Sequence, residues 1–375
     1  MNPRTKRISI QIGLFVITVI TTTLAGVEWQ FGRFLFYDEN PLTWEYFLKG
    51  FAFSVPFLGV LTVHEFGHYF TAKKHKVDAT LPYYIPMWLG FLFAPSIGTF
   101  GAVIRIKDFV NSRKKYFDIG ISGPLAGFVV ALGVLFYGFT HLPPPEYIYE
   151  IHPEYQEYGL DYADHVYQDE PGSFKLGTTL LFEFFKTYVA DPERVPNDHE
   201  MIHYPWLFAG FLSLFFTALN LIPIGQLDGG HVLYGLIGSR LHQKVSAILF
   251  IIYIFYAGLG TVNPYEPTDD LMFGIPLYLG FLYIVFSRLT PSAQTNFLIA
   301  LAVFSAQFLL ASYNPLLRGY QGWLLFGLLI GRFLGIYHPP VHINHPLSTG
   351  RKILGWLALL IFILCFSPEP FIIDY

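Results

Sequence analysis

The chain has 375 residues, of which 53% are hydrophobic and only 13% are charged, so it is not an ordinary soluble domain. Its 23 basic and 27 acidic residues give a net charge of −4, which provides no basic surface for nucleic acid, and we expect no nucleic-acid partner. A single cysteine, Cys365, excludes an intrachain disulfide and a cysteine-based zinc cluster. Any metal chemistry must therefore use histidines and carboxylates.

Apolar runs long enough to cross a hydrocarbon core of about 30 Å recur along the whole sequence. The first run follows three basic residues, but it is long enough to span and lacks a convincing cleavage site, so we keep it as a helix. We expect an all-α polytopic membrane protein with about nine transmembrane helices. The predicted spans are residues 8–27, 47–70, 117–140, 204–222, 245–262, 273–287, 296–312, 320–335 and 353–367.

Basic residues indicate the orientation of these spans. With the N-terminus in the cytoplasm, most Lys and Arg fall on cytoplasmic loops, as the retention of positive charge predicts. Residues 141–203 would lie on the opposite side, and they contain 13 of the 27 acidic residues. Within them, residues 176–190 are apolar but carry Glu183 and Lys186, which favours an interfacial helix over a tenth crossing. We expect no separate soluble domain.

Residues 81–97 are apolar but interrupted by prolines and a glycine, which is too irregular for a plain span. The last six residues of the next stretch, 98–107, alternate in character like a β-strand. We therefore expect a re-entrant or β-hairpin element between the second and third spans.

The second span ends in the sequence His64-Glu65-Phe66-Gly67-His68. Spacing of i and i+4 places both imidazoles on one face of a helix, where they can share one zinc ion. Glu65 projects from an adjacent direction, from which a carboxylate can reach a water on the metal and act as a general base. Ionisable side chains inside an apolar helix are costly, so this cluster indicates a function rather than a polar helix face.

A hydrolytic zinc site needs a third protein ligand and one open position. Asp228 lies in a stretch broken by Pro223 and by glycines, where local unwinding can turn a carboxylate toward a metal. Asp228 is therefore the candidate third ligand. An aspartate at a helix end in contact with water is the alternative.

At these residues the chain resembles the site-2 proteases, which are intramembrane zinc metalloproteases of the peptidase M50 type. The resemblance rests on HEFGH at 64–68, SGPLAG at 122–127 and the pattern NxxPxxxLDG from Asn220 to Gly229, in the family's order. It covers about residues 46–245. The family commonly carries a PDZ module or a pair of CBS domains, and we identify neither here, which puts PDZ-based substrate selection in doubt.

The resemblance implies that His64, His68 and Asp228 hold one zinc ion, that Glu65 activates water and that Asn220 helps to stabilise the oxyanion. It also implies three regions, namely residues 1–45 with the first transmembrane helix and an outer loop, the protease core 46–245, and additional transmembrane helices in 246–375. The small residues of SGPLAG are expected to allow close helix packing.

We therefore expect an endopeptidase that cleaves membrane proteins in or next to their transmembrane segments, in regulated intramembrane proteolysis. Its partners would be a transmembrane substrate and the lipid bilayer. We expect a multi-pass protein of the bacterial inner membrane with its active site near the cytoplasmic face. The strand in 98–107 would hold unwound substrate extended at its edge, or else form an ordinary amphipathic hairpin.

Three other functions are compatible with some of these residues. A membrane metal-ion carrier could use the same His and Asp residues, but such sites more often lie at the midplane between repeats, and no repeat is evident. A prenyl-protein-processing protease would use a glutamate as third ligand, and an inactive relative would only bind transmembrane segments. The prolines between His338 and His345 predict a structural loop, and His75 and His231 are expected at the membrane interface.

Overall fold

The structure is a computed structural model of the chain, and it describes residues 2–36, 40–92, 94, 96–167 and 174–373. The long helices are α1 (Pro3–Phe31), α3 (Phe51–Lys74), α4 (Arg113–Thr140), α7 (Pro205–Leu221), α9 (Ser239–Ala257), α10 (Thr268–Phe286), α11 (Ala293–Tyr313) and α13 (Thr349–Cys365). The shorter helices are α2 (Trp44–Lys49), α5 (Ala163–Val166), α6 (Leu180–Tyr188), α8 (Asp228–Ile237) and α12 (Gly322–Leu328), the last continued by a π-helical segment, Leu329–Leu334. The strands are β1 (Tyr83–Pro86), β2 (Thr99–Val103), β3 (Phe174–Leu176) and β4 (Phe371–Ile373).

Each of the nine predicted apolar ranges is helical over most of its length in the part of the chain described here, although α9 ends at Ala257, five residues before the predicted end. Among the described residues, five helical segments are long and apolar enough to cross a membrane, at Arg4–Phe31, Trp44–Lys74, Arg113–Thr140, Thr268–Phe286 and Ala293–Tyr313. The chain is therefore a mostly helical, polytopic membrane protein, and nine crossings stay a prediction. The apolar segment expected at 176–190 forms α6, whose nine residues are too few to span a bilayer.

Internal contacts divide the chain into two compact units. The first comprises Met1–Val110, Ser122–Leu219 and Leu360–Tyr375, and the second comprises Asn111–Ile121 and Asn220–Leu359. These units are defined by proximity in space, and the sequence-based regions 1–45, 46–245 and 246–375 stay a prediction.

In the first unit, α1 and α3 approach closely because small residues line their contact. A Cβ added at Gly50 would lie 2.4 Å from the carbonyl oxygen of Thr23, and one at Gly26 would lie 2.9 Å from Phe53. The hydroxyls of Thr23 and Ser54 are 2.8 Å apart and form a hydrogen bond between the helices. Small residues and interhelical hydrogen bonds are the usual means of helix association in a membrane.

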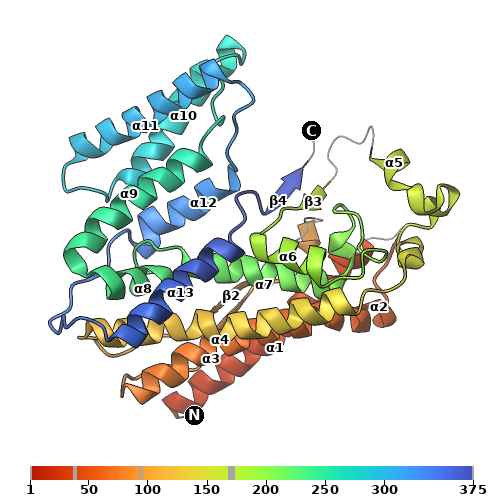
Figure 1. The fold of residues 1–375 in the computed structure, drawn as a ribbon, viewed down its shortest axis with the longest axis horizontal. Helices are drawn as coiled ribbons and strands as arrows, with labels where there is room; N and C mark the ends of the chain where they lie inside the picture. The colour runs from red at the N-terminus through yellow and green to blue at the C-terminus, as the bar shows by residue number, and fades with distance from the viewer. Residues whose placement is uncertain (1, 37–39, 93, 95, 168–173, 374–375) are drawn as a thin grey trace. The chain divides into compact units, whose positions relative to one another are not determined.

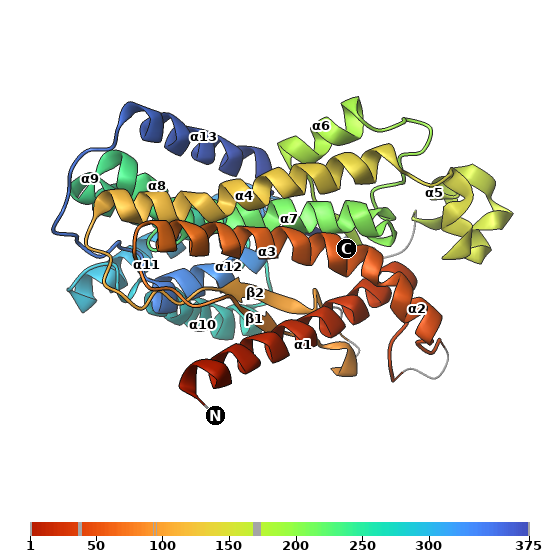
Figure 2. The ribbon, with the colours of Figure 1, turned by 90° about the horizontal axis from the view of Figure 1, so that it is seen from below.

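The expected hairpin between α3 and α4 is present, with β1 and β2 antiparallel and beside α1 (Figure 2). Side chains of α1 hold the segment that contains the hairpin: Gln11 donates to the carbonyl of Leu81, just before β1 (2.6 Å), and Trp29 donates to that of Ser96, between the strands (2.9 Å). The segment is thereby fixed along the length of α1.

The predicted position of the strand, in the last six residues of 98–107, is wrong by several residues, because β2 spans Thr99–Val103. Beyond Val103 the pairing is reduced to an isolated bridge between Ala79 and Ile106. The backbone N–H of Arg105 donates to the side-chain hydroxyl of Thr80 (3.0 Å) instead of to a carbonyl of a partner strand, which interrupts the ladder.

A second pair of strands joins the distant ends of the first unit. β3 lies in the connection between α4 and α7, and it pairs antiparallel with β4 at the C-terminus, with Leu176 opposite Phe371. The N–H of Gly177 donates to the carbonyl of Pro370 (2.9 Å) and extends this contact. The C-terminal strand therefore lies with the acidic loop.

In the second unit, α10 and α11 lie side by side (Figure 1). Gln307 on α11 links them to α9: it accepts a hydrogen bond from the hydroxyl of Tyr278 on α10 (3.0 Å), and its amide donates to the carbonyl of Phe255 on α9 (2.8 Å). A buried, fully bonded amide is the kind of group that holds membrane helices together.

Candidate active site

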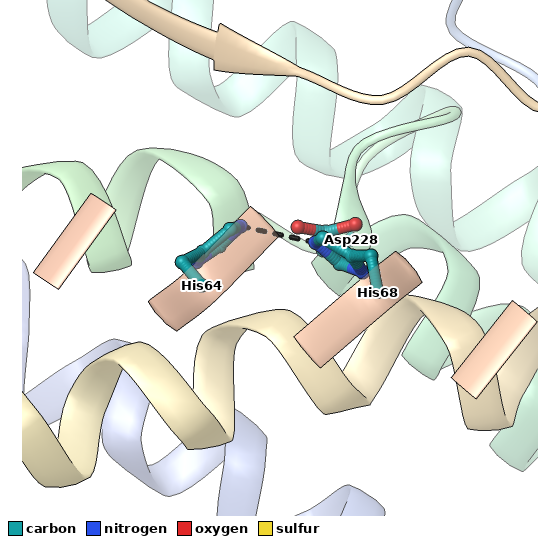
Figure 3. Close-up of side chains that lie close together, drawn as sticks. All are labelled: His64, His68 and Asp228. Carbon is teal, nitrogen blue, oxygen red and sulfur yellow. Dashed lines mark hydrogen bonds between the residues drawn. The ribbon is translucent and has the colours of Figure 1, made fainter. Parts of the chain in front are cut away.

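The motif HEFGH lies in the second half of α3, and its two histidines face each other. The Nε2 atoms of His64 and His68 are 3.0 Å apart, and both side chains are buried, with 5% and 6% of their surface exposed (Figure 3). Two ligands about 2.0–2.1 Å from one tetrahedral zinc ion are roughly 3.3 Å apart. The separation of the imidazole nitrogens therefore fits a shared zinc ion, as the i, i+4 spacing predicts.

Helix α4 makes room for these imidazoles with the glycines of SGPLAG. A Cβ added at Gly123 would lie 2.1 Å from Nε2 of His68, and one at Gly127 would lie 3.0 Å from Cβ of His64. The hydroxyl of Ser122 donates to the carbonyl of Gly67 (3.0 Å), which fixes the register of the two helices. The packing role predicted for this stretch is thus present, and it is directed at the histidines themselves.

Glu65 is also buried, with 6% of its surface exposed, and it belongs to the same helical turn as His64. The turn before it contacts the hairpin, because the hydroxyls of Thr62 and Tyr84 are 2.7 Å apart. Tyr84 packs there with Leu58 and Leu61 of α3. The hairpin is therefore anchored one to two turns before the motif.

Asn220 and Asp228 belong to the second unit. Asn220 lies in the last turn of α7, and Asp228 is the first residue of α8 and is partly buried; Figure 3 draws its side chain. Between them the chain leaves the helix at Pro223 and reverses through Gly225, whose φ of +61° favours glycine. Unwinding at the proline and glycine is therefore as predicted.

The turn that precedes Asp228 is fixed by close contacts. The N–H of Gly225 donates to the hydroxyl of Ser246 (2.9 Å), which donates to the carbonyl of Ile336 (2.7 Å). A Cβ added at Gly229 would lie 2.0 Å from the carbonyl oxygen of Leu221, so position 229, directly after Asp228, has room only for glycine. The start of α8 is thereby held in one position.

One group of candidate ligands was not predicted from the sequence. His152, Glu200 and His203, all in the first unit, each offer one ligand atom, and these atoms lie within 4.8 Å of one another. The signal that could have indicated these three residues is the presence of several histidines in an otherwise acidic loop. The predicted loop from His338 to His345 is non-helical as expected, although His338 is buried and stacks on Tyr234 with 3.8 Å between ring centroids.

Comparisons with known proteins agree with this chemistry. The family model for peptidase family M50 matches residues 52–259, more than half of the chain. "Probable zinc metalloprotease EGY2, chloroplastic" of Oryza sativa subsp. indica is 24% identical over 311 residues, covering 75% of this chain and 51% of the relative. "Probable zinc metalloprotease EGY1, chloroplastic" of Arabidopsis thaliana is 26% identical over 240 residues, covering 60% and 39%. The chain thus spans about half the length, or less, of these relatives. No solved structure matches it.

Proposed function

We propose, from the premise that the chain belongs to peptidase family M50, the site-2 metalloproteases, that it is a zinc-dependent endopeptidase cleaving membrane proteins in or next to their transmembrane segments. The observation that carries the proposal is the pair of buried imidazoles on α3, with their Nε2 atoms 3.0 Å apart and a buried carboxylate between them in sequence. Such a group inside an apolar helix is costly unless it has a function.

In this proposal one zinc ion is held by His64, His68 and Asp228. Two imidazoles and a carboxylate are a donor set that zinc accepts, and three protein ligands leave one position for the reactants. The family pattern around Asp228 and the rigid turn before it support its assignment as the third ligand. When bound, zinc would supply a Lewis acid that polarises the scissile carbonyl and acidifies water.

The protein residues would handle the proton and the developing charge. Glu65 would accept the proton of the attacking water and return it to the leaving amine. The side-chain amide of Asn220 would donate a hydrogen bond to the oxyanion. Burial of the site would keep bulk water away from the reacting groups.

The substrate would be bound as an extended strand. A helical peptide uses its carbonyls in its own hydrogen bonds, so it must unwind before hydrolysis. β2 offers an edge next to α3, and Phe100 and Val103 on this strand are exposed, with 68% and 47% of their surface accessible. Addition of a strand to such an edge is a common mode of peptide recognition. An active site near the cytoplasmic face and a location in a bacterial inner membrane belong to this proposal as well.

The proposal is tested by reconstituting the full chain with single-span substrates. We expect Glu65→Gln to keep its zinc and to lose at least about 100-fold in cleavage rate, since general bases contribute about 10²–10⁴-fold. We expect Asp228→Ala to lose zinc, and a chelator to stop cleavage by the parent. Glu157→Gln in the exposed loop is the matched control and should cleave normally.

A metal-ion carrier predicts the opposite pattern. It would move zinc across the vesicle membrane without cleaving any substrate. Glu65→Gln would leave the rate of zinc transport unchanged, because a carrier needs no general base. A Glu65→Gln protein as active as the parent would remove the proposed base.

A further inference from the structure

The group formed by His152, Glu200 and His203 lies in the connection between α4 and α7, outside the candidate membrane spans. His152 precedes the 3-10 turn Pro153–Glu157, while Glu200 and His203 flank a second turn at Met201–His203. All three belong to the first unit, and they are separate in sequence from the motif on α3. They are not needed for the reaction proposed above.

The ligand atoms of this group are spaced like the corners of a metal coordination shell. Nε2 of His152 and Nε2 of His203 are 3.4 Å apart, and Oε2 of Glu200 is 3.4 Å from the latter and 3.9 Å from the former. Ligands about 2.0–2.1 Å from a tetrahedral zinc ion are separated by roughly 3.3 Å. The three atoms would therefore need to move by only a few tenths of an ångström to bind one ion.

The hydrogen bonds of each imidazole leave Nε2 to face this common point. Nδ1 of His203 lies 2.8 Å from the carbonyl oxygen of Gln30, and Nδ1 of His152 lies 3.1 Å from a carboxylate oxygen of Glu154. Both oxygens accept hydrogen bonds, so each Nδ1 donates to its oxygen and each ring turns its Nε2 toward the group. A metal-binding histidine is usually oriented in this way by an oxygen on its other nitrogen.

Glu200 contributes a buried carboxyl group to the same point. Its side chain is 2% exposed, Oε1 accepts a hydrogen bond from the hydroxyl of Tyr167, and Oε2 has no hydrogen-bond partner among the described residues. A buried carboxylate oxygen without a hydrogen-bond partner, facing two imidazole nitrogens, is costly unless a cation pairs with it.

We propose that His152, Glu200 and His203 bind a second zinc ion, which cross-links the loop between α4 and α7. Two imidazole nitrogens and a carboxylate oxygen suit this borderline-soft ion, and His152, with 29% of its side chain exposed, leaves a side open for its entry and for a fourth ligand. Through the hydrogen bond from His203 to Gln30, the ion would also fasten the loop to α1.

The test uses the full chain in detergent, stripped with a chelator and titrated with zinc alone. In a His64→Ala, His68→Ala background, which removes the α3 ligands, we expect about one zinc per chain. Adding His152→Ala should weaken that binding by at least about 100-fold, because removing a ligand costs more than the 10–100-fold typical of a partner outside the coordination shell. Adding His165→Ala, a histidine in the same loop that stacks on Tyr158, should leave it unchanged.

A second measurement covers failure of the double background to fold. In the otherwise unchanged parent, His152→Ala should reduce bound zinc from about two ions to one while Glu65-dependent cleavage chemistry persists. A background chain that folds but binds no zinc would overturn the proposal and indicate that a proton bridges the imidazoles. Zinc binding that is equal with and without His152 would overturn it as well. A parent protein that binds zinc at the loop site but not at the α3 histidines would contradict the proposed function and not this inference.

Discussion

At the scale of single residues, the geometry of the α3 histidines depends on the absence of side chains on the neighbouring helix. Nε2 of His68 occupies space that a methyl group at position 123 would fill, while Gly133 on the same helix has no atom within 4 Å of its Cβ position. Both glycines have the same intrinsic cost in a helix, about 1 kcal/mol relative to alanine. Only one of them is required by the site.

We therefore expect Gly123→Ala to displace the His68 imidazole, to weaken zinc binding and to reduce cleavage at least tenfold. Overpacking of this kind typically costs about 1–3 kcal/mol. Zinc content and cleavage rate of the purified protein are the measurements. Gly133→Ala is the matched control and should be as active as the parent and slightly more stable. A Gly123→Ala protein with normal zinc content would show that the contact is not important.

Asp78 provides a pH-dependent contact at the base of the hairpin. Hydrogen bonds from Lys107 (2.7 Å) and Lys73 (2.9 Å) lower the pKa of this carboxyl to about 2 from its usual 3.8. A depressed pKa stabilises the folded state above pH 4, and this contribution is lost as the pH falls through about 2. We expect the protection of backbone amides around Asp78 against hydrogen exchange, relative to the unstructured rate at the same pH, to fall over this interval in the parent. Asp78→Asn should show the reduced protection already at pH 7, and lowering the pH to about 2 should not reduce it further through this side chain.

At the scale of elements, the proposed role of the hairpin can be separated from that of the zinc site. Proline at position 103 or 104 removes a backbone donor next to the exposed end of β2 and prevents a regular strand pairing there. We expect Ile104→Pro to raise KM for a transmembrane substrate severalfold without changing zinc content. Ile104→Val keeps the donor and should behave like the parent. Unaltered cleavage by Ile104→Pro would reject substrate capture at this edge.

The helices could be predicted from the sequence because each apolar run must satisfy its backbone within the helix. Their ends were less predictable: α1 begins at Pro3 because Asn2 caps the N–H of Arg4, and it ends at Phe31 because Gly32 adopts a left-handed conformation. The spacing of His64 and His68 is local and therefore readable in the sequence. The approach of His152 to His203 is not, because the two residues are 51 positions apart in the sequence and no local spacing brings them together.

At the scale of the whole molecule, the pairing of β3 with β4 restricts the number of membrane crossings. β3 follows three candidate spans, and β4 lies at the C-terminus, so both ends of this pairing must be on the same side of the membrane. An even number of crossings must therefore follow β3. Two crossings, by α10 and α11 alone, give a total of five, and six crossings, with α7, α9, α12 and α13 included, give nine. Totals of eight or ten are excluded.

Cysteine labelling with an impermeant reagent distinguishes five crossings from nine. In a Cys365→Ala background, Glu369→Cys should be labelled from the same side as Glu157→Cys, because β3 pairs with β4. Lys114→Cys should be labelled only from the opposite side, because α4 crosses the membrane between Lys114 and the acidic loop. The decisive position is the exposed Arg240, which precedes most of α9. With nine crossings, Arg240→Cys reacts from the side of Lys114, where positively charged loops are retained. Reaction from the side of Glu157 would mean that α7 does not cross, and the nine-helix topology would then be wrong.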